Sequence, residues 1–460
     1  TGASGGNFTN TGGTIEATGT SSLVALESGV TVTGGTLTTS SGGLLETPGG
    51  HSVTLNGLTN SGTYSGNDNS QTILQGTINN TGSLQLNSTN SATELRISGN
   101  VTLSGSGSVT MSNNANNFIL GNTGTSDTLT NKQTIQGAGN IGDGQMTLVN
   151  SGTINANAGV GQNVLTIQTS GGTTNTGTLE ATNGTLILSG FNGGTFTNTG
   201  GTIKATGTGS VVALESGATI TGGTLTTSSG GLLETPGGNT ATLSGVTNSG
   251  TYSVNDNATT ILSGTVTNSG SLQLNSSNSP TELRISGNVT LSGSGTVTMS
   301  NNANNFIFGN STGSEILTSA NTIQGAGNIG DGFMGFVNTG KVIANQSNVL
   351  YIDTDSSAFN NKGTIQANTG STLEILGPSG SFTNFNSSTD TLTGGTYIAD
   401  GTIQFGTSNS TANDITTNAA KITLSGTSSQ ILDQFGNNAL ANLATNAAGG
   451  NFTINSGRNY

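Results

Sequence analysis

Apolar and polar residues alternate in short runs along most of the chain. In VTLSG, Val101 and Leu103 fall on one side of an extended segment, and the Thr and Ser next to them fall on the other, because successive side chains of a strand point to opposite faces. The stretch from Ser83 holds three such runs, SLQLNS, TELRIS and NVTLSGSG. The pattern predicts many short strands with aliphatic side chains inside and Thr and Ser side chains outside.

Turns of the type Asn-Ser/Thr-Gly precede many of these runs at similar intervals, which is the mark of a repeat architecture. The first strand residues after such turns are Thr14, Thr36, Thr63, Ser83, Ser108, Thr134, Thr153, Thr178 and Thr202. Two or three strands within a period of about 23 residues are typical of one rung of a parallel β-helix, in which stacked rungs bury the core that one rung cannot bury alone. We therefore predict an all-β, right-handed parallel β-helix (β-solenoid) of roughly twenty rungs of about 23 residues.

The alternation also predicts the interior and the corners of the rungs. Asn residues at equivalent corners are expected to stack their side-chain amides into ladders. Only Gln430–Ala444 has helix-like apolar spacing, and because Gly436 interrupts it we interpret it as another irregular rung, with a small cap as the alternative. Core positions, with their second-repeat counterparts, are expected at Ile15, Val32, Leu37, Leu86, Leu95, Ile97, Val101, Leu103, Ile119, Ile135, Ile154, Leu165, Ile167, Leu179 and Leu188.

A longer repeat is superimposed on this period. The segment 8–151 aligns without a gap with 196–339, so the numbers of equivalent positions differ by 196 − 8 = 188, and Phe382 begins a third copy that soon diverges. The eight steps from Thr14 to Thr202 fill this offset and average 188/8, roughly 23.5 residues. We predict a single continuous solenoid over residues 1–460, with long repeats at 8–195 and 196–381 and a partial third at 382–460.

The stretch TIQGAGNIGDG at 134–144 recurs at 322–332 and contains the spacing G-x-G-x-x-G. A dinucleotide-binding turn requires a helix after the third glycine, but Gly142 is followed by the strand-like MTLV and then by Asn150 and Gly152. We therefore interpret TIQ as a strand and GAGNIGDG as a corner, where Gly and Asn adopt positive φ at the least cost.

Composition narrows the possible functions. Charged residues are 6% of the chain, against about 25% in ordinary soluble domains. The net charge of −13 without basic patches argues against nucleic acid as a partner. No stretch approaches the length of a membrane-spanning helix, so we expect no membrane insertion of this segment. The absence of cysteine excludes thiol chemistry and Cys-ligated metals.

Few residues are candidates for chemistry. The only histidine, His51, is replaced by Asn239 in the second repeat, so we interpret it as a solvated turn residue. Glu27 and Glu46, with their counterparts Glu215 and Glu234, lie on neighbouring rungs. Stacking there would bring carboxylates to about 5–6 Å, the separation of a retaining glycosidase pair. Because arginine and aromatic residues are scarce, we interpret them instead as solubilising surface residues.

Two further sets of charged residues are candidates for an ion pair or a metal site. Glu94 and Arg96 are two apart on a strand and are expected to form a surface pair. Asp143 and Asp331 stand in Gly-Asp-Gly corners, but each long repeat has one such corner where a calcium-binding repeat needs many, so calcium there stays an open alternative. We predict no catalytic, cofactor-binding or metal-binding residues, no cofactor, and no enzyme activity.

The chain resembles the β-solenoid stalks of bacterial surface proteins in three features. These are the recurrent turn–strand motif Asn-Ser/Thr-Gly-Thr-Ile/Leu/Val, the high content of Gly, Asn, Thr and Ser, and the lack of cysteine. Autotransporter passengers and filamentous-haemagglutinin-like adhesins are the nearest groups, and residues 421–460 are similar to strand-repeat modules of large exoproteins. The resemblance implies secretion, an extracellular or cell-surface location, and a structural or adhesive role, with a glycan or host-surface receptor as a partner. It assigns no functional residues.

Three functions therefore compete on sequence grounds. The leading one is a non-enzymatic structural rod, such as a stalk, fibre or adhesin segment. Both ends interrupt the running pattern, so we expect either that more solenoid continues in the native protein or that copies of the chain associate end to end into filaments. The alternative is a carbohydrate-active β-helix enzyme, a polysaccharide lyase or glycoside hydrolase. A third, an ice-binding solenoid, would need a continuous flat row of outward Thr, hinted at by VTVTG at Val30 and TLTTS at Thr36.

Overall fold

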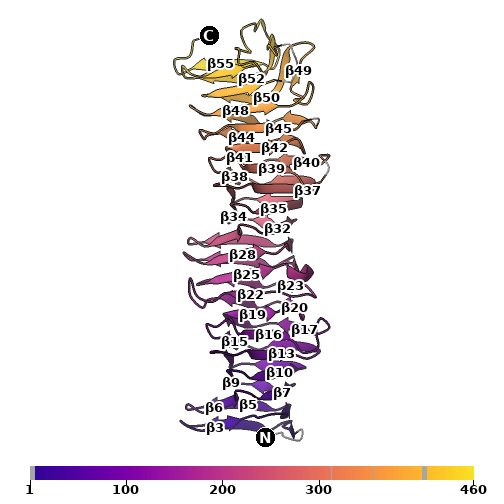
Figure 1. Cartoon of the computed structure of the whole chain (residues 1–460), viewed down its shortest axis with the longest axis vertical. Helices are drawn as coiled ribbons and strands as arrows, with labels where there is room; N and C mark the ends of the chain where they lie inside the picture. Colours follow the sequence, from indigo (N-terminus) through magenta and orange to yellow (C-terminus); the bar gives the residue numbers. More distant parts are fainter. Residues whose placement is uncertain (1–5, 312, 356, 407–411, 460) are drawn as a thin grey trace. The chain divides into compact units, whose positions relative to one another are not determined.

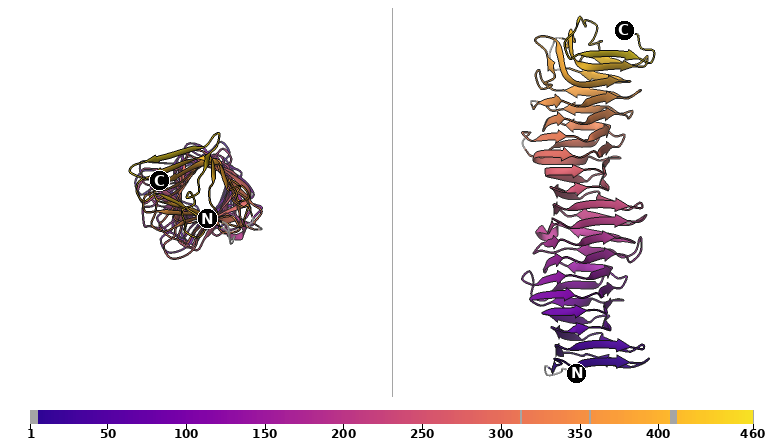
Figure 2. Two further views of the ribbon diagram at one scale, coloured as in Figure 1. Left: turned by 90° about the horizontal axis from the view of Figure 1, so that it is seen from above. Right: turned by 180° about the vertical axis from the view of Figure 1, so that it is seen from behind.

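The computed structural model describes residues 6–311, 313–355, 357–406 and 412–459. Its contacts group the chain into two units, the first ending at Glu234 and the second beginning at Thr235, and each is described by itself. Within each unit short parallel strands stack as successive coils of the chain (Figures 1 and 2). The predicted all-β solenoid with about 23 residues per rung is confirmed.

In the first unit, each rung contributes one strand to each of three parallel ladders. The first ladder contains β1 (Asn7–Thr9), β4 (Thr31–Thr33), β7 (Ser52–Asn56), β10 (Gln71–Gln75), β13 (Thr93–Ile97), β16 (Asn117–Gly121), β19 (Gly139–Gly142), β22 (Leu165–Ile167), β25 (Thr185–Ser189), β28 (Val211–Glu215) and β31 (Leu232–Thr235). The second contains β2 (Thr14–Thr18), β5 (Thr36–Ser40), β8 (Thr59–Asn60), β11 (Thr77–Asn80), β14 (Asn100–Ser104), β17 (Thr128–Asn131), β20 (Thr147–Asn150), β23 (Thr173–Asn175), β26 (Thr195–Thr197) and β29 (Ala218–Thr221). The third contains β3 (Leu23–Ala25), β6 (Leu44–Thr47), β9 (Thr63–Asn67), β12 (Ser83–Asn87), β15 (Ser108–Met111), β18 (Thr134–Gly137), β21 (Thr153–Ala156), β24 (Thr178–Ala181), β27 (Thr202–Thr206) and β30 (Thr224–Ser228). A short 3-10 turn, η1 (Phe191–Gly193), follows β25.

The second unit repeats this arrangement. One ladder contains β34 (Thr251–Asn255), β36 (Ser271–Asn275), β38 (Thr296–Met299), β41 (Thr322–Gly325), β44 (Lys341–Ala344), β47 (Thr364–Ala367), β50 (Thr391–Ala399), β52 (Thr417–Ser425) and β55 (Asn451–Asn455). Another contains β32 (Thr240–Ser244), β35 (Thr259–Asn268), β37 (Thr281–Ser292), β39 (Asn305–Gly309), β42 (Gly327–Gly330), β45 (Leu350–Asp353), β48 (Thr372–Leu376), β51 (Thr402–Phe405) and β53 (Gln430–Leu432). Because β35, β37, β50 and β52 are long enough to serve two ladders, the third adds only β33 (Thr247–Asn248), β40 (Ile316–Ser319), β43 (Gly335–Asn338), β46 (Phe359–Asn361) and β54 (Thr445–Asn446).

One long repeat does not contain a whole number of rungs. The residues of β1 recur in β26, so one long repeat holds 26 − 1 = 25 strands, which is eight three-strand rungs and one strand more. A rung thus averages 188 × 3/25, roughly 22.6 residues, rather than the predicted 23.5. Equivalent strands therefore lie in different ladders of the first unit: β2 pairs with β5 in the second ladder, whereas their repeats β27 and β30 pair in the third.

The predicted series of rung starts was wrong at one step for the same reason. It passed from Thr36 to Thr63, but Thr36 is aligned with Thr59 in the second ladder. The strand that begins at Thr63 lies in the third ladder, where its Tyr64 is aligned with Leu45. The turn signature marks the starts of strands in more than one ladder, so it cannot by itself show which strands stack.

Interior positions follow the predicted alternation. Every expected first-repeat core residue is buried except Ile15, which is half-buried. Ile15 is aligned with Leu37 on one side, and no described rung covers its other side. Its counterpart Ile203 is fully buried between Leu179 and Leu225. Burial here depends on a neighbour in both directions, which is the expected behaviour of stacked rungs.

The Gly-rich motif is more strand than predicted. TIQG forms β18 and GNIG forms β19, so the corner between them is Ala138, and Asp143 begins the next corner. Gly137 has φ 118°, and a Cβ there would collide with the backbone carbonyl of Met111 in the rung below. The glycine is needed for both the left-handed backbone and the close approach of two rungs.

The predicted amide ladders are present and buried. In the first unit Asn131, Asn150, Asn175 and Asn198 each have 0% exposure, and the Nδ2 of one donates to the Oδ1 of the next at 2.8, 2.8 and 2.7 Å. In the second unit Asn248 donates to Asn268, and Asn268 to Asn321, both at 2.8 Å. These bonds satisfy polar groups that would otherwise be costly to bury.

Candidate functional site

His51 lies at the corner before β7, beside a groove of about 350 Å³ that Ser28, Gln71 and Glu94 also line. Its Nδ1 accepts the backbone N–H of Ser28 at 3.2 Å and lies 2.8 Å from the Ser28 Oγ. Among the described residues no hydrogen bond joins His51 to a carboxylate, and Glu94 instead accepts from Arg96 at 2.7 Å. The Ser–His pair therefore lacks the third group that orients a catalytic imidazole.

The four glutamates that are candidates for acid–base chemistry lie on or next to neighbouring strands. In the first repeat, Glu46 lies on β6 and its Oε2 accepts from Asn67 at 2.8 Å. In the second repeat, partial burial and the charge of Glu234 raise the pKa of Glu215. Raised carboxyl pKa values suit general acids, but the residues aligned with this pair, Ser189 and Ala213, offer neither an aromatic ring nor a cation.

Asp143 and Asp331 occupy the corners after β19 and β42 with positive φ, 43° and 45°. Partial burial raises the pKa of Asp143. For Asp331, burial is joined by the charges of Asp353 and Glu282, which raise its pKa further. Across the described part of the chain, no three His, Cys, Asp or Glu side chains are grouped so as to hold a metal ion.

A more extensive arrangement surrounds the predicted Glu94–Arg96 pair, which is present at 2.7 Å. The positions of β13, β16, β19 and β22 that alternate with the interior form two adjacent rows in the first unit, in which Leu120 is buried. The first row is Glu94, Phe118, Asn140 and Thr166. The second row is Arg96, Leu120, Gly142 and, beside that glycine, Gln168.

The second unit carries the matching rows on β37, β39, β42 and β45. The first of these rows is Glu282, Phe306, Asn328 and Tyr351. The second is Arg284, Phe308, Gly330 and, beside that glycine, Asp353. Arg284 bonds Glu282 at 2.7 Å, and its guanidinium carbon lies 5.0 Å from the centre of the Phe308 ring. Phe306 and Phe308 meet edge to face with their centres 6.2 Å apart.

This second set of rows was not identified from the sequence. Its members are scattered between Glu282 and Asp353, and among them only Asn328 and Gly330 belong to a motif recognised in the sequence. The available signal was the difference between aligned repeats, because Phe308, Tyr351 and Asp353 replace Leu120, Thr166 and Gln168. Only the strand register shows that these differences fall on neighbouring rungs.

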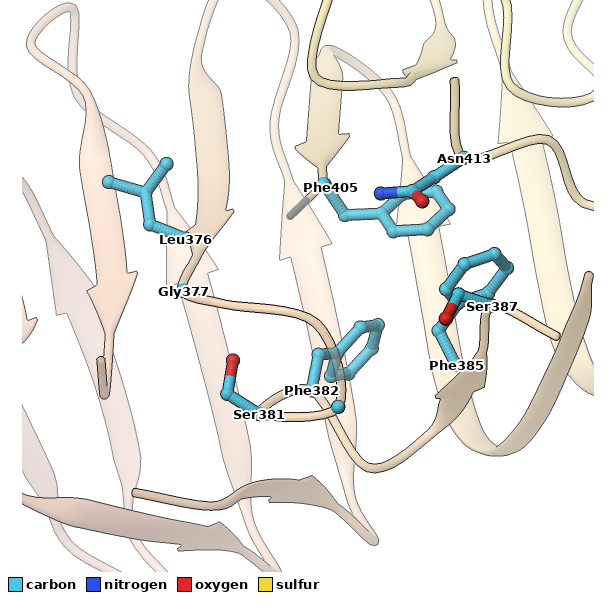
Figure 3. Close-up of a pocket in the computed structure, with 10 residues that line it drawn as sticks. Leu376, Gly377, Ser381, Phe382, Phe385, Ser387, Phe405 and Asn413 are labelled. Carbon is cyan, nitrogen blue, oxygen red and sulfur yellow. The ribbon is translucent and has the colours of Figure 1, made fainter. Parts of the chain in front are cut away.

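A small cavity lies where the third copy departs from the repeat. Eight extra residues, 385–392, follow Asn384 and form the antiparallel pairing of β49 (Phe385–Asn386) with β50. Phe382, Phe385 and Phe405 line the cavity (Figure 3), and the rings of Phe385 and Phe405 are 5.0 Å apart. Its volume is about 10 Å³, close to that of one water, so we interpret it as a packing irregularity.

The Thr rows considered for ice binding do not continue between repeats. TLTTS is β5 in the second ladder and β30 in the third. Thr segments with the same sequence thus lie on different ladders of the first unit, and the repeat does not extend one Thr array.

Comparison of the chain with family models, with curated protein sequences and with solved structures gives no significant match. In the described residues, no helix has the length and apolarity needed to cross a bilayer.

Proposed function

We propose that the chain is a non-enzymatic structural segment of an extracellular or cell-surface protein, such as a stalk, fibre or adhesin segment. The observation that supports this most is the stacking of parallel ladders along each unit. The interior is filled by aliphatic side chains and closed by bonded amides. Such an arrangement resists shear between rungs and exposes few edges.

End-to-end association is part of this proposal. Rungs of similar geometry repeat along each unit, so the strands of a second copy can pair with those of the first and extend its ladders. Sedimentation velocity over a hundredfold range of concentration should then show linear oligomers, and a constant monomer would contradict this part.

Small-angle scattering tests the structural role directly. An isolated monomer should give the distance distribution of an elongated particle, and a compact distribution would overturn the proposal. A reducing-sugar assay on a panel of polysaccharides addresses the enzyme alternative. We expect no product, and no change on replacing Glu27, Glu46, Glu215 and Glu234 together by Gln. Cleavage that this variant lost would favour the enzyme.

A further inference from the structure

We propose that the outer face of β37, β39, β42 and β45 is a saccharide-binding surface, formed by Phe306, Phe308, Tyr351, Arg284 and Asp353, and specific for neutral or amino sugars. This goes beyond the proposed structural role, because a segment that only spaces other parts of a protein needs no such surface. It stands on residues of the second unit alone.

The first argument is the direction of change between the repeats. Five of eight matched positions are identical in the two sets of rows, namely the Glu, Arg, first Phe, Asn and Gly. The three that differ add two aromatic rings and one carboxylate: Leu120, Thr166 and Gln168 become Phe308, Tyr351 and Asp353. At the adjoining corner, Gln145 is likewise replaced by Phe333, which is 54% exposed. In a chain with 4% aromatic residues, such a cluster on one face is unusual.

The second argument is the spacing and the exposure of the rings. Phe306 is aligned with Asn328, and Asn328 with Tyr351, so the two rings are two rungs apart in one row. Two rungs span about 10 Å, which suits two sugar rings separated by one further ring in an extended oligosaccharide. Between them Gly330 leaves the second row without a side chain, next to Asp353. All three aromatic side chains of the rows are half-buried, so their outer surfaces face solvent.

The third argument is that the polar groups are held in place. Arg284 is fixed by Glu282 on one side and by the face of Phe308 on the other, which reduces the entropy lost when its remaining N–H groups bind a hydroxyl. Asn328 and Asp353 offer further donors and acceptors close by. Aromatic rings that cover the apolar faces of sugars, with a few fixed polar groups for their hydroxyls, are the usual composition of such a site.

Charge selects the class of sugar. The face carries the carboxylates of Glu282, Asp331 and Asp353 and one guanidinium, that of Arg284, which is already paired with Glu282. Burial raises the pKa of Asp331, and the charges of Asp353 and Glu282 raise it further. Uronic, sialic or sulfated sugars would meet like charge here, which disfavours their binding. Uncharged hexose chains and amino sugars would not.

The test is affinity electrophoresis of the full chain through gels that contain galactomannan, mixed-linkage β-glucan, glycol chitosan or alginate. We expect retardation by at least one of the first three and none by alginate. The triple variant Phe308→Leu/Tyr351→Thr/Asp353→Gln should bind at least tenfold more weakly. It should still fold, because the first unit holds those residues at the same register, and equal melting temperatures would confirm this.

The converse substitutions in the first repeat test whether these three residues themselves cause the binding. Leu120→Phe/Thr166→Tyr/Gln168→Asp, made in the otherwise unchanged chain, should raise the stoichiometry of oligosaccharide binding in calorimetry from one site to two. The proposal is overturned if no neutral or amino polysaccharide binds, if alginate alone binds, or if the triple variant binds as tightly as the parent. Each of these outcomes leaves the scattering test of the structural role unaffected.

Discussion

The two long repeats share one unchanged Gly-rich corner and differ at outward positions of the strands beside it. TIQGAGNIGDG is identical in both repeats, and in both a Cβ at the first glycine, Gly137 or Gly325, would strike a methionine carbonyl of the rung below. On the outer rows, by contrast, Leu120 has become Phe308 and Thr166 has become Tyr351. Contact between rungs therefore restricts this corner, whereas the strand positions beside it have changed between the repeats.

One column of the interior also differs, and its members have changed together. The first unit aligns Leu148, Thr173 and Phe196 in one inward column. The second aligns Phe336 with Phe359, and an isolated bridge aligns Phe359 with Phe382. Their rings stack with centres 5.5 and 5.4 Å apart. A larger residue at one level is accommodated by larger neighbours at the levels next to it, because an interior column is packed as a unit.

The largest effect on stability is expected at inward positions, where equivalent residues of the two repeats should respond alike. Leu103→Asp and its second-repeat counterpart Leu291→Asp should each lower the free energy of unfolding by at least about 4 kcal/mol, because both bury an unpaired charge. Thr102→Asp, one residue away and facing outward, should change it by less than about 0.5 kcal/mol. Urea unfolding measures these changes. Equal tolerance of Leu103→Asp and Thr102→Asp would refute the assignment of faces.

The phenylalanine column predicts the next largest effect. Phe359→Thr installs the residue that the first unit carries at Thr173, yet it should cost about 3–5 kcal/mol, because Phe336 and Phe382 cannot fill the gap. The same unfolding assay applies, with Phe306→Thr on the outer face as the control. A loss below about 1 kcal/mol for Phe359→Thr would show that the column does not pack as a unit.

The amide ladders should behave alike in both units. Asn150→Ala breaks bonds to Asn131 and Asn175 and leaves their amides short of a partner, which we expect to cost about 1–3 kcal/mol. Asn268→Ala, between Asn248 and Asn321, should cost a similar amount. Hydrogen exchange of the neighbouring backbone amides would locate the loss. A cost confined to one unit would mean that the ladders are not equivalent.

Fold class, rung length and interior were predictable because alternation and turn signatures are local properties. Leu103 and Ile154 could be assigned from their nearest neighbours in sequence. The pairing of Thr36 with Thr59 could not, because it depends on how three strands close a rung. The saccharide-binding surface could not be predicted for the same reason. Asp353 and Glu282 are far apart in the sequence, and only the register brings their rungs together.

A smaller effect concerns acid stability, and here the repeats should agree. Asp68 accepts the backbone N–H groups of Thr89, Asn90 and Ser91 at 2.7, 2.9 and 2.9 Å, which lowers its pKa to about 2. Asp256 has the same kind of site and a pKa of about 2. Because both pKa values are below the ordinary 3.8, the stabilisation is present above that value and is lost as the pH falls toward 2.

The double variant Asp68→Asn/Asp256→Asn should therefore melt slightly below the parent at pH 7, and the difference should shrink between pH 4 and pH 2. Thermal melts followed by circular dichroism measure it. Each single variant should contribute about half, and a difference that is independent of pH would show that the carboxylate charge is not responsible.

The smallest effect, and the most specific to the comparison, is on the pKa of the two corner aspartates. Burial alone raises the pKa of Asp143, whereas the charges of Asp353 and Glu282 add to burial at Asp331. Asp353→Gln, which installs the first-repeat residue, should lower the pKa of Asp331, and Gln168→Asp should raise that of Asp143. Carboxyl ¹³C shifts followed over a pH titration report both. A raised carboxyl pKa means that the folded state favours the protonated form, so deprotonation of Asp331 as the pH rises destabilises the fold. Asp353→Gln should reduce this loss of stability. If the pKa of Asp331 does not move, Asp331 and Asp353 do not interact, and the outer rows of the second unit do not form the surface proposed for them.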